Sequence, residues 1–168
     1  MTNSDSLIEE IKQEIVLRIC NEGIPRIKKC LSHLDEEQVW FSPNEQIPSI
    51  ANLILHLNGN VRQWFLDGFC AIVYIRYREN EFNAKKTLTK LELLNILDQL
   101  STDIQNNIYK IKHDILLDRK VIQQHFEVSG YSIISHVIEH FSYHVGQITT
   151  LTKILTSKDL AYYGDMDL

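Results

Sequence analysis

Hydrophobic residues recur along most of this chain at spacings of three and four, the interval that lines one face of an α-helix. In the first part of the chain, Gly23 and Pro25 interrupt this pattern, so we expect one helix kinked there or two short helices. A second helix is predicted to begin at Ser49. The hydrophobic positions of these two regions are Ile8, Ile11, Ile15, Ile19, Ile24, Ile27, Leu31 and Leu34, and then Ile50, Leu53, Ile54, Leu57, Val61, Trp64 and Phe65.

Polar residues that can cap a helix mark a third and a fourth helix. Thr89-Lys90-Leu91-Glu92 is a capping box, and hydrophobic residues follow it at helical spacing as far as Ile111. Ser129 can cap a last helix that runs from about Gly130 to Leu155. Four long helices predict an all-α fold, a four-helix bundle that occupies residues 1–168 as a single domain.

The connections between these helices differ in length and character. Residues 35–48 contain two of the three prolines and read as a loop with an exposed Trp40-Phe41 pair. Residues 67–86 make a long connection between the second and third helices; the sequence leaves open whether this segment extends the second helix or forms a loop. Between residues 113 and 128 we expect an irregular connection in which Val121-Ile122 forms a short strand.

The composition narrows the class of protein. Hydrophobic residues make up 44% of the chain and charged residues 23%, as in an ordinary soluble domain. The net charge of −5 argues against a nucleic-acid partner, which needs basic residues for its phosphates. The chain has no apolar run of the ~18 residues that a membrane span requires and no signal peptide, so we expect no membrane partner. Cys20, Cys30 and Cys70 are an odd number without metal-type spacing, which favours reduced thiols in a cytoplasmic protein.

Three of the seven histidines, His136, His140 and His144, lie within nine residues of the last predicted helix. Histidines four residues apart lie about 40° apart around the helix axis and about 6 Å apart along it, so His140 and His144 can share one metal ion. Apolar neighbours indicate that this face points into the bundle. A buried imidazole without a partner costs about 1–3 kcal/mol, and metal ligation removes that cost with the neutral ring. Alternatively, the histidines lie at the edge of the face and bond to neighbours or water.

His56 occupies a core position of the second predicted helix, with Leu53 one turn before it and Asn60 one turn after it. Gly59 in the same helix costs about 1 kcal/mol relative to Ala, which indicates close approach of another helix or of a ligand. A third histidine from a facing helix would complete a three-histidine site with open positions. That pattern is typical of a catalytic metal rather than a structural one.

Two motifs in these helices match those of a known family. His56 begins a His-Leu-x-Gly-Asn-x-Arg-x-Trp stretch, and the late His-x-x-x-His is followed by Gly-Gln. In these motifs, and in helix order and length over essentially the whole chain, the sequence resembles the DinB-like superfamily. The resemblance implies a compact four-helix bundle, often a homodimer, that holds a divalent metal with three histidines. Carried over by position, the ligands are His56, His140 and His144.

The resemblance also implies a chemistry. Characterised branches are transferases or isomerases that use low-molecular-weight thiols such as bacillithiol, mycothiol or glutathione, although this chain looks closest to the branches without an assigned activity. The expected cofactors are therefore a divalent metal and a low-molecular-weight thiol. We expect Zn or Ni, with Fe, Mn or Cu as alternatives, because imidazole ligands suit several divalent metals.

Four further residues are candidates for supporting roles. His136 is not one of these three ligands. It either supports a ligand histidine without binding the metal itself, or competes with one of the three as a ligand. Glu139 can orient a ligand histidine or be an ordinary surface carboxylate. Asn60 and Gln147 can bond to substrate or to metal-bound water, or simply pack between helices. The charged run 76–81 reads as a solvated loop in which an arginine could meet the carboxylate of a thiol cofactor. The other three histidines, which we interpret as ordinary, are His33, His113 and His125.

These residues support three classes of function. The first is a metal-dependent enzyme in which the metal lowers the pKa of a bound thiol and presents a thiolate to an electrophile; a variant uses metal-bound hydroxide for hydrolysis. The second is a non-catalytic metal-binding or stress-response module that uses Trp40 and Phe41 for dimerisation or for a partner. The third is a bundle that binds metal only adventitiously. The net charge of −5 favours a small-molecule substrate over nucleic acid.

Overall fold

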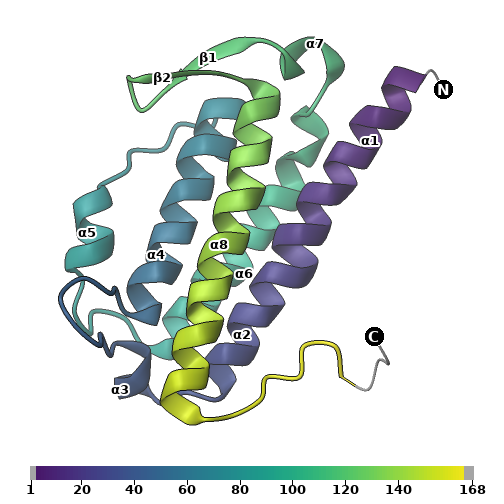
Figure 1. The fold of residues 1–168 in the computed structure, drawn as a ribbon. Helices are drawn as coiled ribbons and strands as arrows, with labels where there is room; N and C mark the ends of the chain where they lie inside the picture. Colours follow the sequence, from purple (N-terminus) through teal and green to yellow (C-terminus); the bar gives the residue numbers. More distant parts are fainter. Residues whose placement is uncertain (1–2, 165–168) are drawn as a thin grey trace.

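The computed structural model describes residues 3–164, and Figure 1 shows long helices that run side by side along one axis. The first helical run joins α1, a π-helical stretch and α2, and the second joins α4 to another π-helical stretch. The third and fourth are α6 and α8. Their bounds are α1 Asn3–Ile15, π-helical Val16–Gly23, α2 Ile24–Ser32, α4 Ile50–Val61, π-helical Arg62–Phe69, α6 Lys90–Asn107 and α8 Gly130–Thr156. The all-α bundle predicted from the periodicity is confirmed.

The apolar faces of these helices meet in one core. Its members are the residues that carry the helical periodicity, and each fully buried Leu or Ile side chain contributes about 1.5–3 kcal/mol relative to an exposed one. Fully buried core residues include Ile19, Ile27, Leu53, Leu57, Leu97 and Ile148. The helices that bear the histidines are therefore fixed against each other by apolar packing.

The first helical run is continuous through the position where a kink or a break was expected. Gly23 has helical backbone angles, and Pro25 lies in the first turn of α2, where a missing N–H costs little. A Cβ on Gly23 would lie 2.7 Å from the ring of Phe141, so this glycine allows α8 to pack closely. In place of a kink or a break, the first helical run contains the π-helical stretch Val16–Gly23.

Hydroxyl caps begin the helices where the sequence predicts them. The Ser49 side chain caps α4, Thr89 completes a capping box with Glu92 at the start of α6, and Ser129 caps α8. The last helix ends at Thr156, within one residue of the predicted end. Capping chemistry thus correctly located the starts of α6 and α8.

The 35–48 connection differs from the predicted loop. A short helix, α3 (Glu36–Val39), forms there because the Asp35 carboxylate accepts two backbone N–H groups and Gln38 completes a capping box. The expectation that Trp40 is exposed was wrong, because the indole packs against the core and donates to the Leu88 carbonyl oxygen at 2.9 Å. Phe41 is exposed, as expected.

The long connection between the second and third helices combines both predicted alternatives. Helical structure continues to Phe69, after which residues 71–77 have no regular secondary structure and their side chains are alternately exposed and partly covered. A short helix, α5 (Arg78–Asn83), follows and packs beside α4. The reading of residues 76–81 as a solvated loop was wrong for two members, because the side chains of Arg76 and Glu81 are 3% and 9% exposed.

The connection before α8 contains α7 (His113–Leu116) and a hairpin of β1 (Arg119–Ile122) and β2 (Phe126–Ser129). The strand predicted at Val121-Ile122 is therefore confirmed, and its antiparallel partner pairs Ile122 with Phe126. The hairpin crosses one end of the bundle near the start of α8 (Figure 1). Among the described residues, no helix is both long and apolar enough to cross a membrane.

Candidate metal centre

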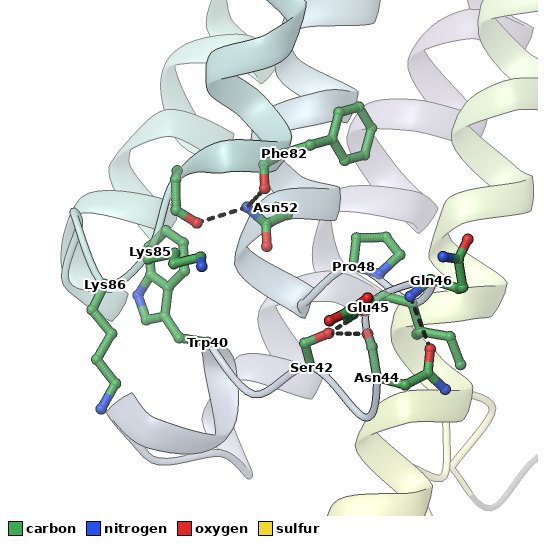
Figure 2. Close-up of a pocket in the computed structure, with 12 residues that line it drawn as sticks. Trp40, Ser42, Asn44, Glu45, Gln46, Pro48, Asn52, Phe82, Lys85 and Lys86 are labelled. Carbon is green, nitrogen blue, oxygen red and sulfur yellow. Dashed lines mark hydrogen bonds between the residues drawn. The ribbon is translucent and has the colours of Figure 1, made fainter.

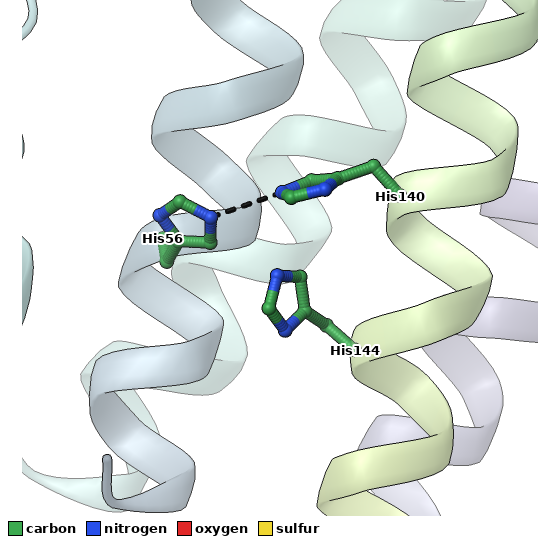
Figure 3. Close-up of side chains that lie close together, drawn as sticks. All are labelled: His56, His140 and His144. Carbon is green, nitrogen blue, oxygen red and sulfur yellow. Dashed lines mark hydrogen bonds between the residues drawn. The ribbon is translucent and has the colours of Figure 1, made fainter. Parts of the chain in front are cut away.

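Three histidines converge from two helices that pack against each other. His56 on α4 faces His140 and His144 on α8 (Figure 3), and one ring nitrogen from each lies within 4.8 Å of the others. The Nε2 atoms of His56 and His140 are 2.9 Å apart. His56 and His144 are buried, and His140 is half-buried. The structure thus brings together the three residues proposed as ligands, in a group that fits a divalent metal.

The outer ring nitrogens of two of these histidines have partners that face away from the cluster. Nδ1 of His56 lies 3.0 Å from Oε2 of Glu81, and Nδ1 of His144 lies 2.7 Å from Oε1 of Gln147. When Nδ1 donates to such an oxygen, the proton is absent from Nε2. Both rings then offer an Nε2 lone pair for a metal.

The electrostatics of the cluster favour neutral rings. Burial lowers the pKa of His140 to about 3, and the neighbouring His144 and His56 add to this effect. Burial also lowers the pKa of His144 and of His136. Metal ligation requires neutral imidazole, so His140 and His144 are in the correct state at neutral pH.

A buried ion pair supports His56 from the side opposite the cluster. Arg76 donates to Glu81 through Nε at 2.6 Å and through a terminal nitrogen at 2.7 Å. Burial alone would raise the pKa of Glu81, but hydrogen bonds from Arg76 and His56 outweigh it and hold that pKa below its usual value. Sequence reasoning missed this role of both residues: it offered an arginine of the 76–81 run to the carboxylate of a thiol cofactor, whereas Arg76 binds the Glu81 carboxylate. Gly59 was a signal that some group approaches this part of α4.

His136 lies beside the triad and is outside the group of three. Its ring packs against Trp64 at 4.1 Å and against His140 at 5.1 Å between centroids, and its Nε2 is 3.4 Å from Nδ2 of Asn60. Asn60 therefore contacts His136. Within residues 3–164, Oδ1 of Asn60 and Nε1 of Trp64 are buried without a hydrogen-bond partner.

Of the two remaining candidates, Gln147 contacts a ligand histidine and, among the described residues, Glu139 does not. Gln147 contacts a ligand histidine directly, as described above, and also donates to the Tyr143 hydroxyl at 3.2 Å. Glu139 is exposed on α8 and, in the described part of the chain, makes no hydrogen bond or ion pair. The other three histidines lie outside the cluster, at the end of α2, in α7 and in the hairpin turn; they are His33, His113 and His125.

Comparison with known families identifies the chain's relatives. A family model described as "Protein of unknown function (DUF1572)" matches residues 11–163, which is most of the chain. The chain belongs to this family. No curated protein matches the DUF1572 chain.

Among solved structures, the DUF1572 chain is similar to a DinB-like protein from Bacillus cereus ATCC 10987. The TM-score is 0.65 at 12% sequence identity, and the alignment covers 83% of this chain and 90% of the Bacillus chain. The DinB-like fold inferred from the histidine motifs is thereby confirmed.

A cavity of about 1000 Å³ lies near the triad, between the 40–48 loop and the segment that follows α5 (Figure 2). Asn52 and Phe82 line it, and the Phe82 ring is 4.9 Å from the ring of His56. The three clustered histidines do not line this cavity. Its volume matches that of small-molecule sites.

Proposed function

We propose that this DUF1572 chain is a divalent-metal-dependent enzyme whose ligands are His56, His140 and His144. The observation that carries the proposal is the convergence of three imidazoles from α4 and α8 within 4.8 Å. Two of these rings are held through Nδ1 by Glu81 and Gln147, which leaves Nε2 for the metal. The expected metal is Zn or Ni, with Fe, Mn or Cu as alternatives.

Three protein ligands leave coordination positions open for a small molecule. When bound, a divalent metal lowers the pKa of a thiol or of water at such a position. Around this metal, the chain would supply three imidazole ligands in a largely buried setting. Asn60 adds a buried carboxamide oxygen without a partner in the described structure, which is suited to accept a hydrogen bond from substrate.

Within this framework we favour thiol-dependent S-transfer with a low-molecular-weight thiol. The DinB-like fold and the histidine motifs support this choice, and the cavity next to Phe82 supports a small-molecule partner. Hydrolysis is the alternative use of the same site. A non-catalytic metal-binding or stress-response module is the third candidate function. Turnover assays separate this module from the two enzymatic functions, S-transfer and hydrolysis.

Metal content tests the proposal directly. Untagged wild-type protein should contain about one divalent metal per chain by elemental analysis, and His140→Ala should contain much less while its circular dichroism stays helical. Wild-type protein that stays metal-free in Zn and Ni titrations would refute metal binding by this site. With metal bound, a rise in melting temperature on addition of glutathione or bacillithiol, together with turnover of an electrophile, supports the thiol-dependent enzyme; the absence of both supports the binding module.

A further inference from the structure

The strongest feature outside the three candidate ligands is the buried contact between Glu81 and His56. We propose that Glu81 is a positioning residue: its carboxylate, held by Arg76 and seated on Gly59, fixes the His56 ring with the proton on Nδ1 and the Nε2 lone pair toward the metal. This inference rests on the proposed function, because it assigns a role in holding that metal.

The two tautomers of His56 have different partners. Nδ1 lies 3.0 Å from Oε2 of Glu81 and also 3.0 Å from a terminal nitrogen of Arg76. A guanidinium only donates hydrogen bonds and an ionised carboxylate only accepts them. With the proton on Nδ1, the ring donates to Glu81 and Nε2 carries a lone pair in place of a proton. With the proton on Nε2, Nδ1 accepts from Arg76 and metal binding at Nε2 is blocked.

Glu81 decides between these two states because it is an anion. A charged acceptor forms a stronger hydrogen bond with an N–H than a neutral one does, so the carboxylate favours the tautomer with the proton on Nδ1. Arg76 keeps Glu81 ionised in a buried place through two hydrogen bonds, at 2.6 and 2.7 Å. Arg76 is itself held by Oε1 of Gln63 at 3.0 Å, and that oxygen accepts from Gln123 of the hairpin at 2.8 Å.

Gly59 makes room for this ion pair against α4. A Cβ built on Gly59 would collide with Oε1 of Glu81 and would lie 2.9 Å from Nε of Arg76. An alanine would therefore displace the carboxylate although it improves helix propensity by about 1 kcal/mol. The glycine at this helical position has a specific purpose, which is to admit the Arg76–Glu81 pair.

The backbone of α5 is docked independently of the carboxylate. Nδ2 of Asn52 on α4 donates to the carbonyl oxygens of Glu81 at 2.8 Å and Ala84 at 3.0 Å. A change confined to the Glu81 side chain therefore leaves this attachment in place. The role of the carboxylate can be tested without removing α5 from the bundle.

The test compares Glu81→Gln with wild type and with a matched control, in full-length protein. The control is Asp103→Asn, because Asp103 also pairs with an arginine, Arg62 at 2.7 Å, and within the described residues no hydrogen bond or ion pair joins either of them to a histidine. We expect Glu81→Gln to weaken Zn and Ni binding by about 10–100-fold in competition titrations, the usual effect of losing such a partner. The Co(II) absorption spectrum of Glu81→Gln should also change in position or intensity, because the His56 ring is reoriented. Asp103→Asn should match wild type in both measurements.

Loss of one charge from a buried pair can destabilise the fold, so a second variant removes both charges. Arg76→Gln combined with Glu81→Gln leaves no unpaired ion, and it should bind metal about as weakly as Glu81→Gln while circular dichroism shows a folded chain. Wild-type affinity and an unchanged Co(II) spectrum in either folded variant would overturn the positioning role. Failure of wild-type protein itself to bind Zn, Ni or Co would instead refute the proposed metal site.

Discussion

Nε2 of His56 and Nε2 of His140 lie 2.9 Å apart, although 84 residues separate them in the chain. Two lone pairs cannot face each other at this distance without repulsion, so the contact requires either a proton or a cation between the nitrogens. Both alternatives give measurable consequences for stability.

Metal should stabilise the folded chain strongly. Free Zn or Ni at about 100 times Kd adds about 2.7 kcal/mol to the free energy of unfolding, which raises Tm by about 5–10 °C for a chain of this size. A chelator should reverse the shift, and His140→Ala should show little of it. Scanning calorimetry with and without metal measures the effect; equal shifts in wild type and His140→Ala would place the metal elsewhere.

The metal-free protein should lose stability as pH falls below about 6.5. The pKa of His140 is about 3 in the folded chain and near 6.5 in the unfolded chain, so between these values the unfolded chain binds more protons. By linkage, stability is fully present above about pH 6.5 and decreases as pH falls toward 3. The lowered pKa values of His136 and His144 act with the same sign. Urea unfolding at pH 7.5, 6 and 5 tests this. The free energy of unfolding should change less with pH in His140→Ala than in wild type.

Gly59→Ala and Gly146→Ala should change stability in opposite directions, although both place alanine inside a helix. At Gly59 the new Cβ collides with Glu81, and we expect a loss of about 1–3 kcal/mol. Nothing lies within 4 Å of a Cβ at Gly146, so helix propensity alone should add about 0.5–1 kcal/mol there. Urea unfolding measures both; a stabilised Gly59→Ala would contradict the packing described here.

Gln147→Leu should weaken metal binding less than Glu81→Gln does. Gln147 holds His144 through a neutral oxygen, and loss of such a hydrogen bond costs about 0.5–1.5 kcal/mol. The expected effect is about 2- to 10-fold in Kd, measured by the same competition titration. A larger loss than in Glu81→Gln would show that the neutral contact matters more than the charged one.

Glu139→Gln should leave metal affinity within about twofold of wild type. Glu139 neighbours His140 in sequence, but it is exposed and acts on the histidines only through space, where solvent screens charges strongly. The same titration checks this expectation. A tenfold loss would restore to Glu139 the role that its sequence position suggests.

Much of this architecture could be predicted because it depends on local rules. Spacings of three and four define the helices, and the hydroxyl caps at Ser49, Thr89 and Ser129 define their starts. The histidine spacing on α8 places two rings on one face without any knowledge of the partner helix. These features need only the geometry of one helix.

The support of His56 could not be predicted in the same way. Arg76 and Glu81 lie in a charged run that reads as solvent-exposed, and their burial depends on the irregular segment, residues 71–77, that brings α5 against α4. Gly59 indicated that something approaches the helix but not which group. Trp40 was misjudged for a related reason, since its partner, the Leu88 carbonyl, is 48 residues away.

The division of the three histidines between two helices ties metal occupancy to tertiary assembly. His140 and His144 are neighbours wherever α8 is helical, even in a partly folded chain. His56 joins them only when α4 packs against α8. A metal ion can therefore bind all three histidines only in the assembled bundle. The binding free energy that His56 adds as the third ligand equals the free energy by which the ion stabilises the packing of α4 against α8.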